Sequence, residues 1–293
     1  MSWRVVVIHH TAKLDLKLNY MVIRREMKTI KIHISEIAVL LVESTSVSLT
    51  AALLAELTKQ KVKVIFCDPQ RNPSSELISY YGSHDTSSKI RMQIQWQPSL
   101  KEAVWTEIVR EKIRQQMNFL VERGKEKEAA LLSEYMQEIR HYDETNREGH
   151  AAKVYFNALF GMEFSRSRDN AINAALNYGY TIILSAFNRE IAVNGYLTQL
   201  GLFHDNMFNP FNLASDLMEP FRVLVDRTVC SMQFVEFEHE QKMKLVDILN
   251  QEVMMEGKHY IVNNAIKRYV KSVFNALNDS DIALLSFCSE YEL

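Results

Sequence analysis

Hydrophobic and polar residues alternate with a period of two near the start of the chain. Over residues 14–22, Leu, Leu, Leu, Tyr and Val at the even positions alternate with Asp, Lys, Asn and Met at the odd positions, which is the pattern of a strand with one buried and one exposed face. Further strand-like runs occur at 31–34, 37–42 and 62–67, and residues 51–59, rich in Ala and Leu, predict a short helix before the last run. This part of the sequence therefore predicts a compact β-rich domain with one small helix.

The hydrophobic period changes to that of helices near residue 98. Residues 69–98 hold three of the five prolines and a polar stretch, so they predict a linker. Ser99 is a suitable helix N-cap, and no proline occurs between Pro98 and Pro210. Because a proline inside a helix costs about 3 kcal/mol, its absence favours long helices, which we expect near 99–123, 126–141, 146–160, 167–187, 188–203, 213–230, 239–255 and 258–277.

These patterns predict an α+β protein with two parts. A β-rich N-terminal domain covers 1–98, with a linker from about residue 69, and a larger all-α domain covers 99–293. The 293 residues are 47% hydrophobic and 24% charged, as in a soluble globular protein. No apolar stretch approaches the roughly 20 residues that a membrane span needs, and the first residues lack the apolar core of a signal peptide. The three scattered cysteines lack metal-ligand spacing, so we expect a cytoplasmic protein with reduced thiols.

Charge is distributed unevenly along the chain. The formal net charge is -2, but residues 1–97 carry 13 basic and 8 acidic residues, whereas residues 98–293 carry 21 basic and 28 acidic residues. Neither part is a polycation. Any contact with DNA must therefore come from local basic patches.

Short motifs of familiar enzyme classes are absent from the sequence, which has no Walker loop, GxSxG, HExxH or paired CxxC. The candidates for chemistry are four polar residues of the helical part: Glu148, His204, Asp216 and Glu219. Two or three carboxylates with one imidazole suit Mg²⁺ or Mn²⁺, because such ligands leave positions open for phosphate oxygens and water. Zn²⁺ suits them less, since neither a cysteine nor a second obvious histidine accompanies them.

Each candidate also has a structural interpretation. Thr145 and Glu148 have the spacing of a capping box, His204 could lie at a helix C-terminus, and Asp216 could be an acid near a helix start. Glu219 differs because it precedes a proline, which disfavours ordinary helical geometry. A carboxylate there, among apolar neighbours, needs a partner if it is buried.

Four blocks follow one another in the helical part of the sequence. They are Glu-Gly at 148–149 with Ala-Ala-Lys-Val-Tyr-Phe at 151–156, Asn-Ala-Ala-Leu-Asn-Tyr-Gly-Tyr at 173–180, Gly-Leu-Phe-His at 201–204, and Leu-Ala-Ser-Asp-Leu-Met-Glu-Pro-Phe-Arg at 213–222. In order and spacing these blocks resemble the CRISPR-associated integrase family of spacer acquisition. Shorter similarities at 40–43, 47–50 and 64–68 extend the resemblance over essentially the whole chain. The compact length and residues 209–212 resemble the version found beside the type II-A effector nuclease.

The resemblance implies a fold, a site and an activity. The family has an N-terminal β-sandwich-like domain and a helical domain with a site for Mg²⁺ or Mn²⁺. Matched by motif, Glu148, His204 and Glu219 would be the catalytic metal ligands, with Asp216 as a possible accessory acid. The implied reaction joins the 3′-OH ends of short prespacer DNA to the leader–repeat of the CRISPR array by transesterification.

The resemblance also implies partners. These are double-stranded prespacer DNA, CRISPR leader–repeat DNA, a second copy of the chain in a homodimer, and a small ferredoxin-like CRISPR protein. Two homodimers of the chain would flank a central dimer of that protein in a heterohexamer. Basic residues near the four blocks are candidates for the DNA contacts, although arginines often lie on solvated helix faces and a tyrosine can belong to the core. The expected DNA contacts are Arg222, Arg168, Arg166, Arg147, Lys153 and Tyr178.

Two other functions stay open. A divalent-metal endonuclease of the same fold could cut branched DNA without integrating it. A non-catalytic helical scaffold could bind DNA with polar residues that only cap helices. Convergence of Glu148, His204 and Glu219 in the folded chain would favour an enzyme over the scaffold.

Overall fold

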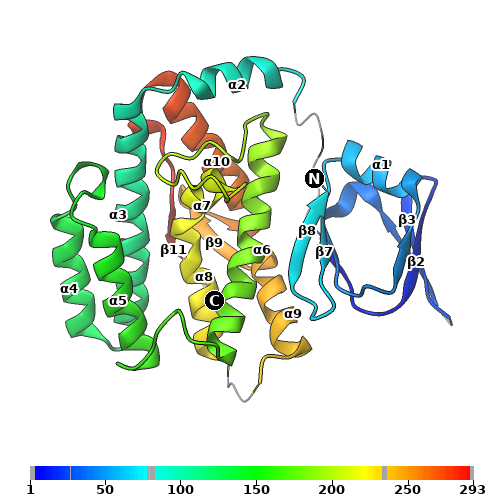
Figure 1. The fold of residues 1–293 in the computed structure, drawn as a ribbon, viewed down its shortest axis with the longest axis horizontal. Helices are drawn as coiled ribbons and strands as arrows, with labels where there is room; N and C mark the ends of the chain where they lie inside the picture. The colour runs from blue at the N-terminus through cyan, green and yellow to red at the C-terminus, as the bar shows by residue number, and fades with distance from the viewer. Residues whose placement is uncertain (1–3, 27, 78, 80–82, 233–235, 291–293) are drawn as a thin grey trace.

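The computed structural model describes residues 4–26, 28–77, 79, 83–232 and 236–290. The fold is mixed α+β, with two sheets from the first 77 residues lying beside a larger group of helices (Figure 1). Within the described residues, no helix is long and apolar enough to cross a membrane.

Two four-stranded sheets form the N-terminal part. The first has the order β1-β5-β7-β8, in which β1, β5 and β7 are parallel and β8 is antiparallel to β7. The second has the order β4-β3-β2-β6. The strands are β1 (Arg4–Ile8), β2 (Ala12–Lys17), β3 (Tyr20–Arg24), β4 (Thr29–His33), β5 (Ile37–Val42), β6 (Val47–Leu49), β7 (Lys63–Cys67) and β8 (Pro73–Leu77).

Both sheets and helix α1 (Ala51–Lys59) share one hydrophobic core. Leu14 of β2, Leu40 of β5 and Leu53 of α1 are fully buried in it. Thr50 caps α1, because its hydroxyl accepts a hydrogen bond from the backbone N–H of Leu53 at 3.3 Å.

The runs predicted at 31–34, 37–42 and 62–67 correspond to β4, β5 and β7, and the predicted helix corresponds to α1. The expectation of one strand over 14–22 is wrong, because Leu18 and Asn19, with φ angles of 48° and 65°, form the turn of a hairpin between β2 and β3. Two sheets around one core are consistent with the β-sandwich-like domain that the resemblance implied.

The region expected to be a linker holds regular structure. Strand β8 extends the first sheet, and helix α2 (Thr86–Ile94) follows it. The expectation of a linker from residue 69 is therefore wrong for these two segments, while residues 78 and 80–82 lie outside the described part. Strand β8 has a polar sequence because it lies at the sheet edge, where a proline and exposed serines are tolerated.

Long helices make up most of the rest of the chain. Along α3, the side chains of Val104, Ile108 and Leu120 are fully buried, as the helical spacing predicted. The helices are α3 (Pro98–Glu122), α4 (Glu126–Gln137), α5 (Arg147–Phe160), α6 (Ala171–Val193), α7 (Asn212–Leu217), α8 (Arg222–Ser231), α9 (His239–Asp247) and α10 (Val262–Asp279). Short 3₁₀ segments are η1 (Ile34–Glu36), η2 (His141–Asp143), η3 (Glu219–Phe221), η4 (Ile248–Asn250) and η5 (Ile282–Leu284).

The expectation of an all-α C-terminal domain is wrong, because a three-stranded sheet of order β10-β9-β11 lies among the helices. Glu256 and Gly257 have φ angles of 53° and 70°, the left-handed conformations of a two-residue hairpin turn. This turn replaces the helical structure expected around it. The strands are β9 (Glu252–Met255), β10 (Lys258–Ile261) and β11 (Cys288–Glu290).

The helix expected over 188–203 is also absent. Helix α6 instead begins at Ala171 and continues to Val193, and Gly195 follows with a φ angle of 86°. That left-handed conformation ends the helix, as glycine commonly does. Residues 194–211 then form an irregular segment that carries His204.

One face of the β1-β5-β7-β8 sheet packs against the second sheet, and its opposite face packs against the helices. Leu40 and Val64 point into the core between the sheets, whereas Val39 and Ile65 belong to the hydrophobic core of the helical part. Successive residues of a strand point to opposite faces, so β5 and β7 contribute to both cores. The N-terminal part and the helices therefore meet over an apolar interface.

Candidate active site

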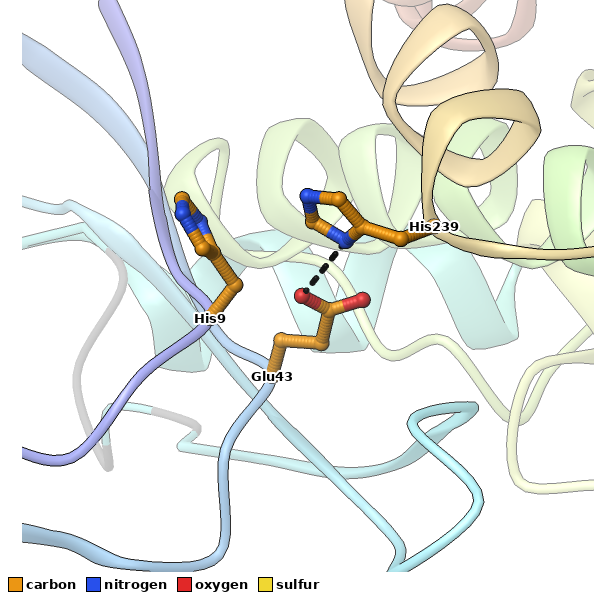
Figure 2. Close-up of side chains that lie close together, drawn as sticks. All are labelled: His9, Glu43 and His239. Atoms are coloured by element: carbon orange, nitrogen blue, oxygen red, sulfur yellow. Dashed lines mark ion pairs between the residues drawn. The ribbon is translucent and has the colours of Figure 1, made fainter.

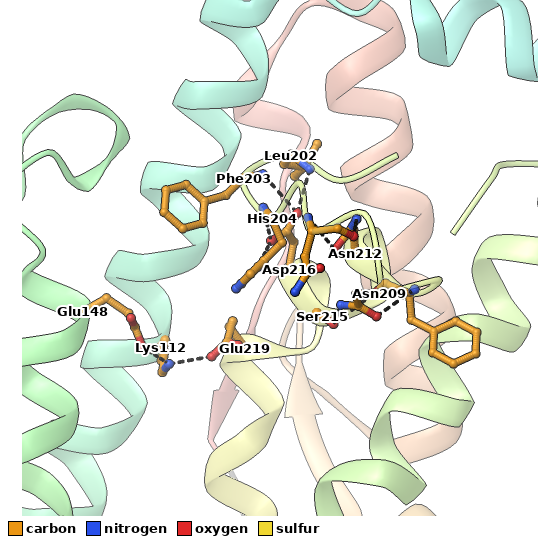
Figure 3. Close-up of polar contacts among 12 residues, drawn as sticks. Lys112, Glu148, Leu202, Phe203, His204, Asn209, Asn212, Ser215, Asp216 and Glu219 are labelled. Carbon is orange, nitrogen blue, oxygen red and sulfur yellow. Dashed lines mark hydrogen bonds and ion pairs between the residues drawn. The ribbon is translucent and has the colours of Figure 1, made fainter. Parts of the chain in front are cut away.

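The candidate residues come from four separate segments. Glu148 is the second residue of α5, Glu219 begins η3, and His204 lies in the segment between α6 and α7. Lys112, in the middle of α3, lies between the two carboxylates (Figure 3). Side chains far apart in the sequence thus meet where α3, α5 and η3 come together.

Glu148 is positioned by a helix start that differs from the predicted one. The carboxylate of Asp143 accepts hydrogen bonds from the backbone N–H groups of Arg147, at 2.8 Å, and Glu148, at 3.0 Å. The hydroxyl of Thr145 is buried without a hydrogen-bond partner, so the capping-box interpretation is wrong. Because Asp143 satisfies the first N–H groups, the Glu148 carboxylate is available to pair with Lys112.

Glu219 is buried where the helix is interrupted before Pro220. Its side chain is only 6% exposed, and its oxygens accept hydrogen bonds from Lys112 Nζ at 2.5 Å and from Arg222 Nε at 2.9 Å. The expectation that a buried acid at this position has partners is confirmed. Burial opposes the charge of Glu219, but Arg222 and Lys112 outweigh it and lower the pKa of the carboxyl to about 2.

Lys112 is a residue of the site that the sequence reasoning missed. Its ammonium pairs with both Glu148 and Glu219, although the lysine is only 7% exposed. Burial opposes the charged form, but the two carboxylates outweigh it and raise the pKa of Lys112. The sequence holds a hint of this role, because Lys112 lies one turn after the buried Ile108 and a lysine is seldom buried without a partner.

His204 is held by Asp216, which is fully buried at the end of α7. The Asp216 carboxylate accepts hydrogen bonds from the backbone N–H groups of Leu202 and Phe203, at 2.6 and 3.0 Å, and from that of His204, at 3.2 Å. It also lies 2.5 Å from His204 Nδ1. Because a carboxylate only accepts, Nδ1 carries the hydrogen and the neutral ring keeps Nε2 as a free donor atom for a metal.

The structure excludes the interpretation of His204 as a residue at a helix C-terminus and of Asp216 as an acid near a helix start. His204 does not end a helix, since α6 stops at Val193, and Asp216 lies near the end of α7 rather than at its start. Asp216 is instead a positioning residue for the 202–204 backbone and for the imidazole. The hydrogen bond that His204 donates to Asp216 raises the pKa of His204, burial opposes it, and the charge of Glu219 raises the pKa further. Glu219 is therefore close enough to His204 to act on its protonation.

The site fits a divalent cation in its donor set. Glu148 and Glu219 already surround one positive charge, the Lys112 ammonium, and His204 offers one nitrogen beside hard carboxylate oxygens. The ligand atoms of Glu148, His204 and Glu219 do not all lie within 4.8 Å of one another. Among the described residues, the group of three such side chains that meets this distance is a different one. Lys112 and a metal ion would therefore compete for the same carboxylates.

The arginines expected to contact DNA already have partners within the protein. Arg222 binds Glu219 and stacks 4.7 Å from the ring centre of Tyr180. Arg166 donates hydrogen bonds of 2.6 Å to Asn173 and Asn177. These two side chains are thus fixed beside the site by contacts that also build the fold.

The other candidates differ in their exposure. Arg168 and Lys153 are exposed, and Arg168 lies 3.6 Å from Glu163. Arg147 is partly buried against Glu138 at 2.8 Å. Tyr178 is only 3% exposed, and most of its ring packs into the core of the helical part. It also contributes to the lining of the open pocket beside Arg166 and Arg168, so a DNA contact through Tyr178 stays a prediction.

The sequence and the fold match known proteins over most of the chain. Residues 5–236 match the family described as CRISPR associated protein Cas1. The chain is 34% identical over 286 residues to the CRISPR-associated endonuclease Cas1 of Neisseria meningitidis serogroup C (strain 8013), an alignment that covers 96% of this chain and 94% of that protein.

Two solved structures share the fold. A casposase bound to integration product has a TM-score of 0.76 at 18% identity and covers 96% of this chain and 92% of its own. A chain of a Cas6-RT-Cas1–Cas2 complex has a TM-score of 0.75 at 16% identity, covering 96% of this chain and 36% of its own. Because the family match and the 34% identical relative both extend over most of the sequence, the chain belongs to the Cas1 family of CRISPR-associated proteins.

Proposed function

We propose that this protein is a metal-dependent DNA integrase of CRISPR adaptation, which joins the 3′-OH ends of short prespacer DNA to the leader–repeat of the CRISPR array. The observation that carries the proposal is the pairing of Glu148 and Glu219 around one cation, with His204 held nearby by Asp216. A scaffold would not need two carboxylates arranged in this way. Family membership and the likeness to a casposase bound to integration product support the same activity.

Glu148, His204 through Nε2, and Glu219 would hold Mg²⁺ or Mn²⁺. When bound, such an ion supplies a Lewis acid for the scissile phosphate and stabilises the charge that develops on its oxygens. Asp216 keeps the donor nitrogen of His204 in its neutral tautomer, and Arg222 keeps the Glu219 carboxylate charged and fixed. Both residues thus prepare the ligands for the cation.

The reaction is a transesterification, in which one bond to phosphorus forms as another breaks and no nucleoside triphosphate is needed. The oxygen of the prespacer 3′-hydroxyl forms a new bond to phosphorus, the bond between phosphorus and the leader-side 3′-oxygen breaks, and a proton moves from the attacking to the leaving hydroxyl through solvent. One phosphodiester replaces another, so no ATP is consumed. The protein's main contribution is to align the two DNA ends.

DNA and protein partners belong to the same proposal. Arg168 and Arg166 line an open pocket with Asn177, and we assign DNA phosphates to this surface, to Arg222 and to the exposed Lys153. The chain forms a homodimer, and two such homodimers flank a dimer of a small ferredoxin-like CRISPR protein in a heterohexamer in the cytoplasm. The likeness to a chain of the Cas6-RT-Cas1–Cas2 complex supports a second CRISPR protein as partner.

An integration assay tests the activity. A labelled short duplex is incubated with a supercoiled plasmid that carries a leader–repeat, with Mn²⁺, with Mg²⁺ or with EDTA, in the presence of the partner protein. The proposal expects label covalently joined to the plasmid only when a divalent ion is present. Joining in EDTA, or no joining under any condition, would contradict it.

The second candidate function is an endonuclease that cuts branched DNA without integrating it. The name of the Neisseria relative, a CRISPR-associated endonuclease, favours this activity. A branched duplex in the same assay separates the two candidates, because an endonuclease releases shortened strands whereas an integrase transfers the labelled end.

A further inference from the structure

A second cluster of ligand-type side chains lies between the first sheet and the helices. His9 follows β1 and Glu43 follows β5, two parallel neighbours in which Ile8 pairs with Val42. Both side chains therefore stand at the carboxyl edge of the sheet. His239, the first residue of α9, faces them from the helical part (Figure 2).

The three side chains are close enough to share one ion. One ligand atom from each lies within 4.8 Å of the others, and the rings of His9 and His239 have centres 4.9 Å apart. His239 Nδ1 lies 3.4 Å from a carboxylate oxygen of Glu43. Donor atoms bound to one ion at about 2.1 Å lie roughly 3–4 Å from each other, so only small side-chain movements are needed.

Glu43 is a buried carboxylate that lacks hydrogen bonds within the described part of the chain. Its side chain is 0% exposed, and neither of its buried oxygens has a hydrogen-bond partner among the residues that the structure describes. Within the same part of the chain, the buried Nδ1 atoms of His9 and His239 have none either. A buried carboxylate charge without hydrogen bonds is strongly unfavourable. A cation bound among the three residues would balance this charge and bind the open oxygen and nitrogen atoms.

Neighbouring protein cations do not supply this charge. Arg71 Nη1 is 3.9 Å from the nearest Glu43 oxygen, which is too far for a hydrogen bond. The ammonium of Lys242 is directed elsewhere, to the backbone oxygens of Gln70 and Arg71 and to the side chain of Asn72. Within the described residues, the carboxylate thus has a long ion pair with Arg71 but no hydrogen bond from a cationic side chain.

The histidines have the chemistry of ligands. A neutral imidazole is the form that binds a metal. Two imidazole nitrogens and one carboxylate oxygen suit Zn²⁺ and related transition metals better than Mg²⁺, which prefers oxygen ligands alone.

We propose that His9, Glu43 and His239 form a structural site for Zn²⁺ or a related transition metal, which fastens the carboxyl edge of the first sheet to α9. The site shares no residue with the Glu148, His204 and Glu219 group. It does not depend on the proposed integrase activity. Since its ligands come from both parts of the chain, the bound ion stabilises their packing against each other.

Metal binding and thermal unfolding of the full-length protein test the site, with Zn²⁺ and Co²⁺ as probes after chelation and dialysis. We expect one Zn²⁺ per chain at this site, a rise of several degrees in Tm, and visible Co²⁺ absorption from the ligand set. The H239A variant should lose the absorption and the Tm shift, and its Zn²⁺ affinity at this site should fall by at least about a hundredfold, because even outer contacts of a metal site contribute 10–100-fold. His239 is 41% exposed, so this variant should fold, which circular dichroism checks.

Two further variants distinguish this site from the proposed active site. H204A should keep the Zn²⁺-dependent rise in Tm and the Co²⁺ absorption, because His204 is not a ligand here. H10A, which changes an exposed histidine whose ring lies 4.4 Å from that of His9, should keep both as well. The proposal is overturned if Zn²⁺ leaves the Tm of the wild-type protein unchanged, if H239A binds as tightly as wild type, or if H204A alone abolishes binding.

Discussion

Replacing Lys112 with methionine tests whether a metal ion and the Lys112 ammonium compete for the carboxylates of Glu148 and Glu219. The substitution replaces the lysine stem with an unbranched apolar side chain one atom shorter and removes the positive charge between Glu148 and Glu219. In the metal-free protein the two carboxylates then repel each other without a cation between them. We expect K112M to be less stable than wild type without metal and to recover stability when Mn²⁺ is added.

The structure sets the size of these effects. Removing one partner of a buried ion pair destabilises a protein by about 3–5 kcal/mol. Glu219 keeps its bond to Arg222 and Glu148 is 31% exposed, so we expect the lower end, about 3 kcal/mol. In wild type, Mn²⁺ must displace a charge-assisted hydrogen bond worth about 1.5–3 kcal/mol. Since 1.4 kcal/mol corresponds to a factor of ten, K112M should bind Mn²⁺ at least about tenfold more tightly.

Urea unfolding with and without Mn²⁺ measures the stability, and electron paramagnetic resonance of free Mn²⁺ measures the affinity. The matched control is K63M, because Lys63 and Glu76 form another buried ion pair, 4% and 9% exposed, in the N-terminal sheet. K63M should be destabilised but should not recover with Mn²⁺. Equal or weaker Mn²⁺ binding by K112M would refute the competition between lysine and metal.

Three further predictions concern the surroundings of the site. The D216N variant should lower the pKa of His204, measured by NMR, and weaken Mn²⁺ binding about 10–100-fold, whereas an unchanged histidine pKa would contradict the positioning role. Burial raises the pKa of Asp226 to about 6, so its proton is bound more tightly in the folded state, and the stability it contributes is lost as the pH rises through 6. Between pH 7 and pH 5 the free energy of unfolding of wild type should therefore rise by about 1 kcal/mol relative to D226N, and equal pH dependence in urea titrations would count against this. The R168A variant should reduce the slope of log affinity against log salt for DNA by about 1, and an identical slope would exclude a phosphate contact.

The sequence predicted the parts of the fold that depend on local patterns. Hydrophobic patterns identified β4, β5 and β7, although the alternation over 14–22 concealed the turn between β2 and β3. The absence of proline identified long helices such as α3. It also indicated that Glu219, placed before a proline among apolar residues, would have an irregular backbone and need a partner. These features depend on a few neighbouring residues, which is why a single sequence is sufficient to infer them.

Other features depend on contacts between distant residues. Lys112 reaches Glu219 across 107 residues, and no periodicity indicates which charge it meets. Asp143 displaced Thr145 as the cap of α5 because the chain turns there through the left-handed conformation of Asn146. The His9, Glu43 and His239 cluster joins two separate parts of the chain, so only the folded structure brings its ligands together.

We propose that Glu148, His204 and Glu219 form the metal site of a DNA integrase. The single-turnover rate of strand transfer by H204A, with saturating Mn²⁺ and the partner protein, tests it most directly. H259A serves as the control, since His259 is exposed on β10. The account predicts that H204A joins DNA at least about a hundredfold more slowly than wild type while H259A is unchanged. Strand transfer by H204A at the wild-type rate would contradict it.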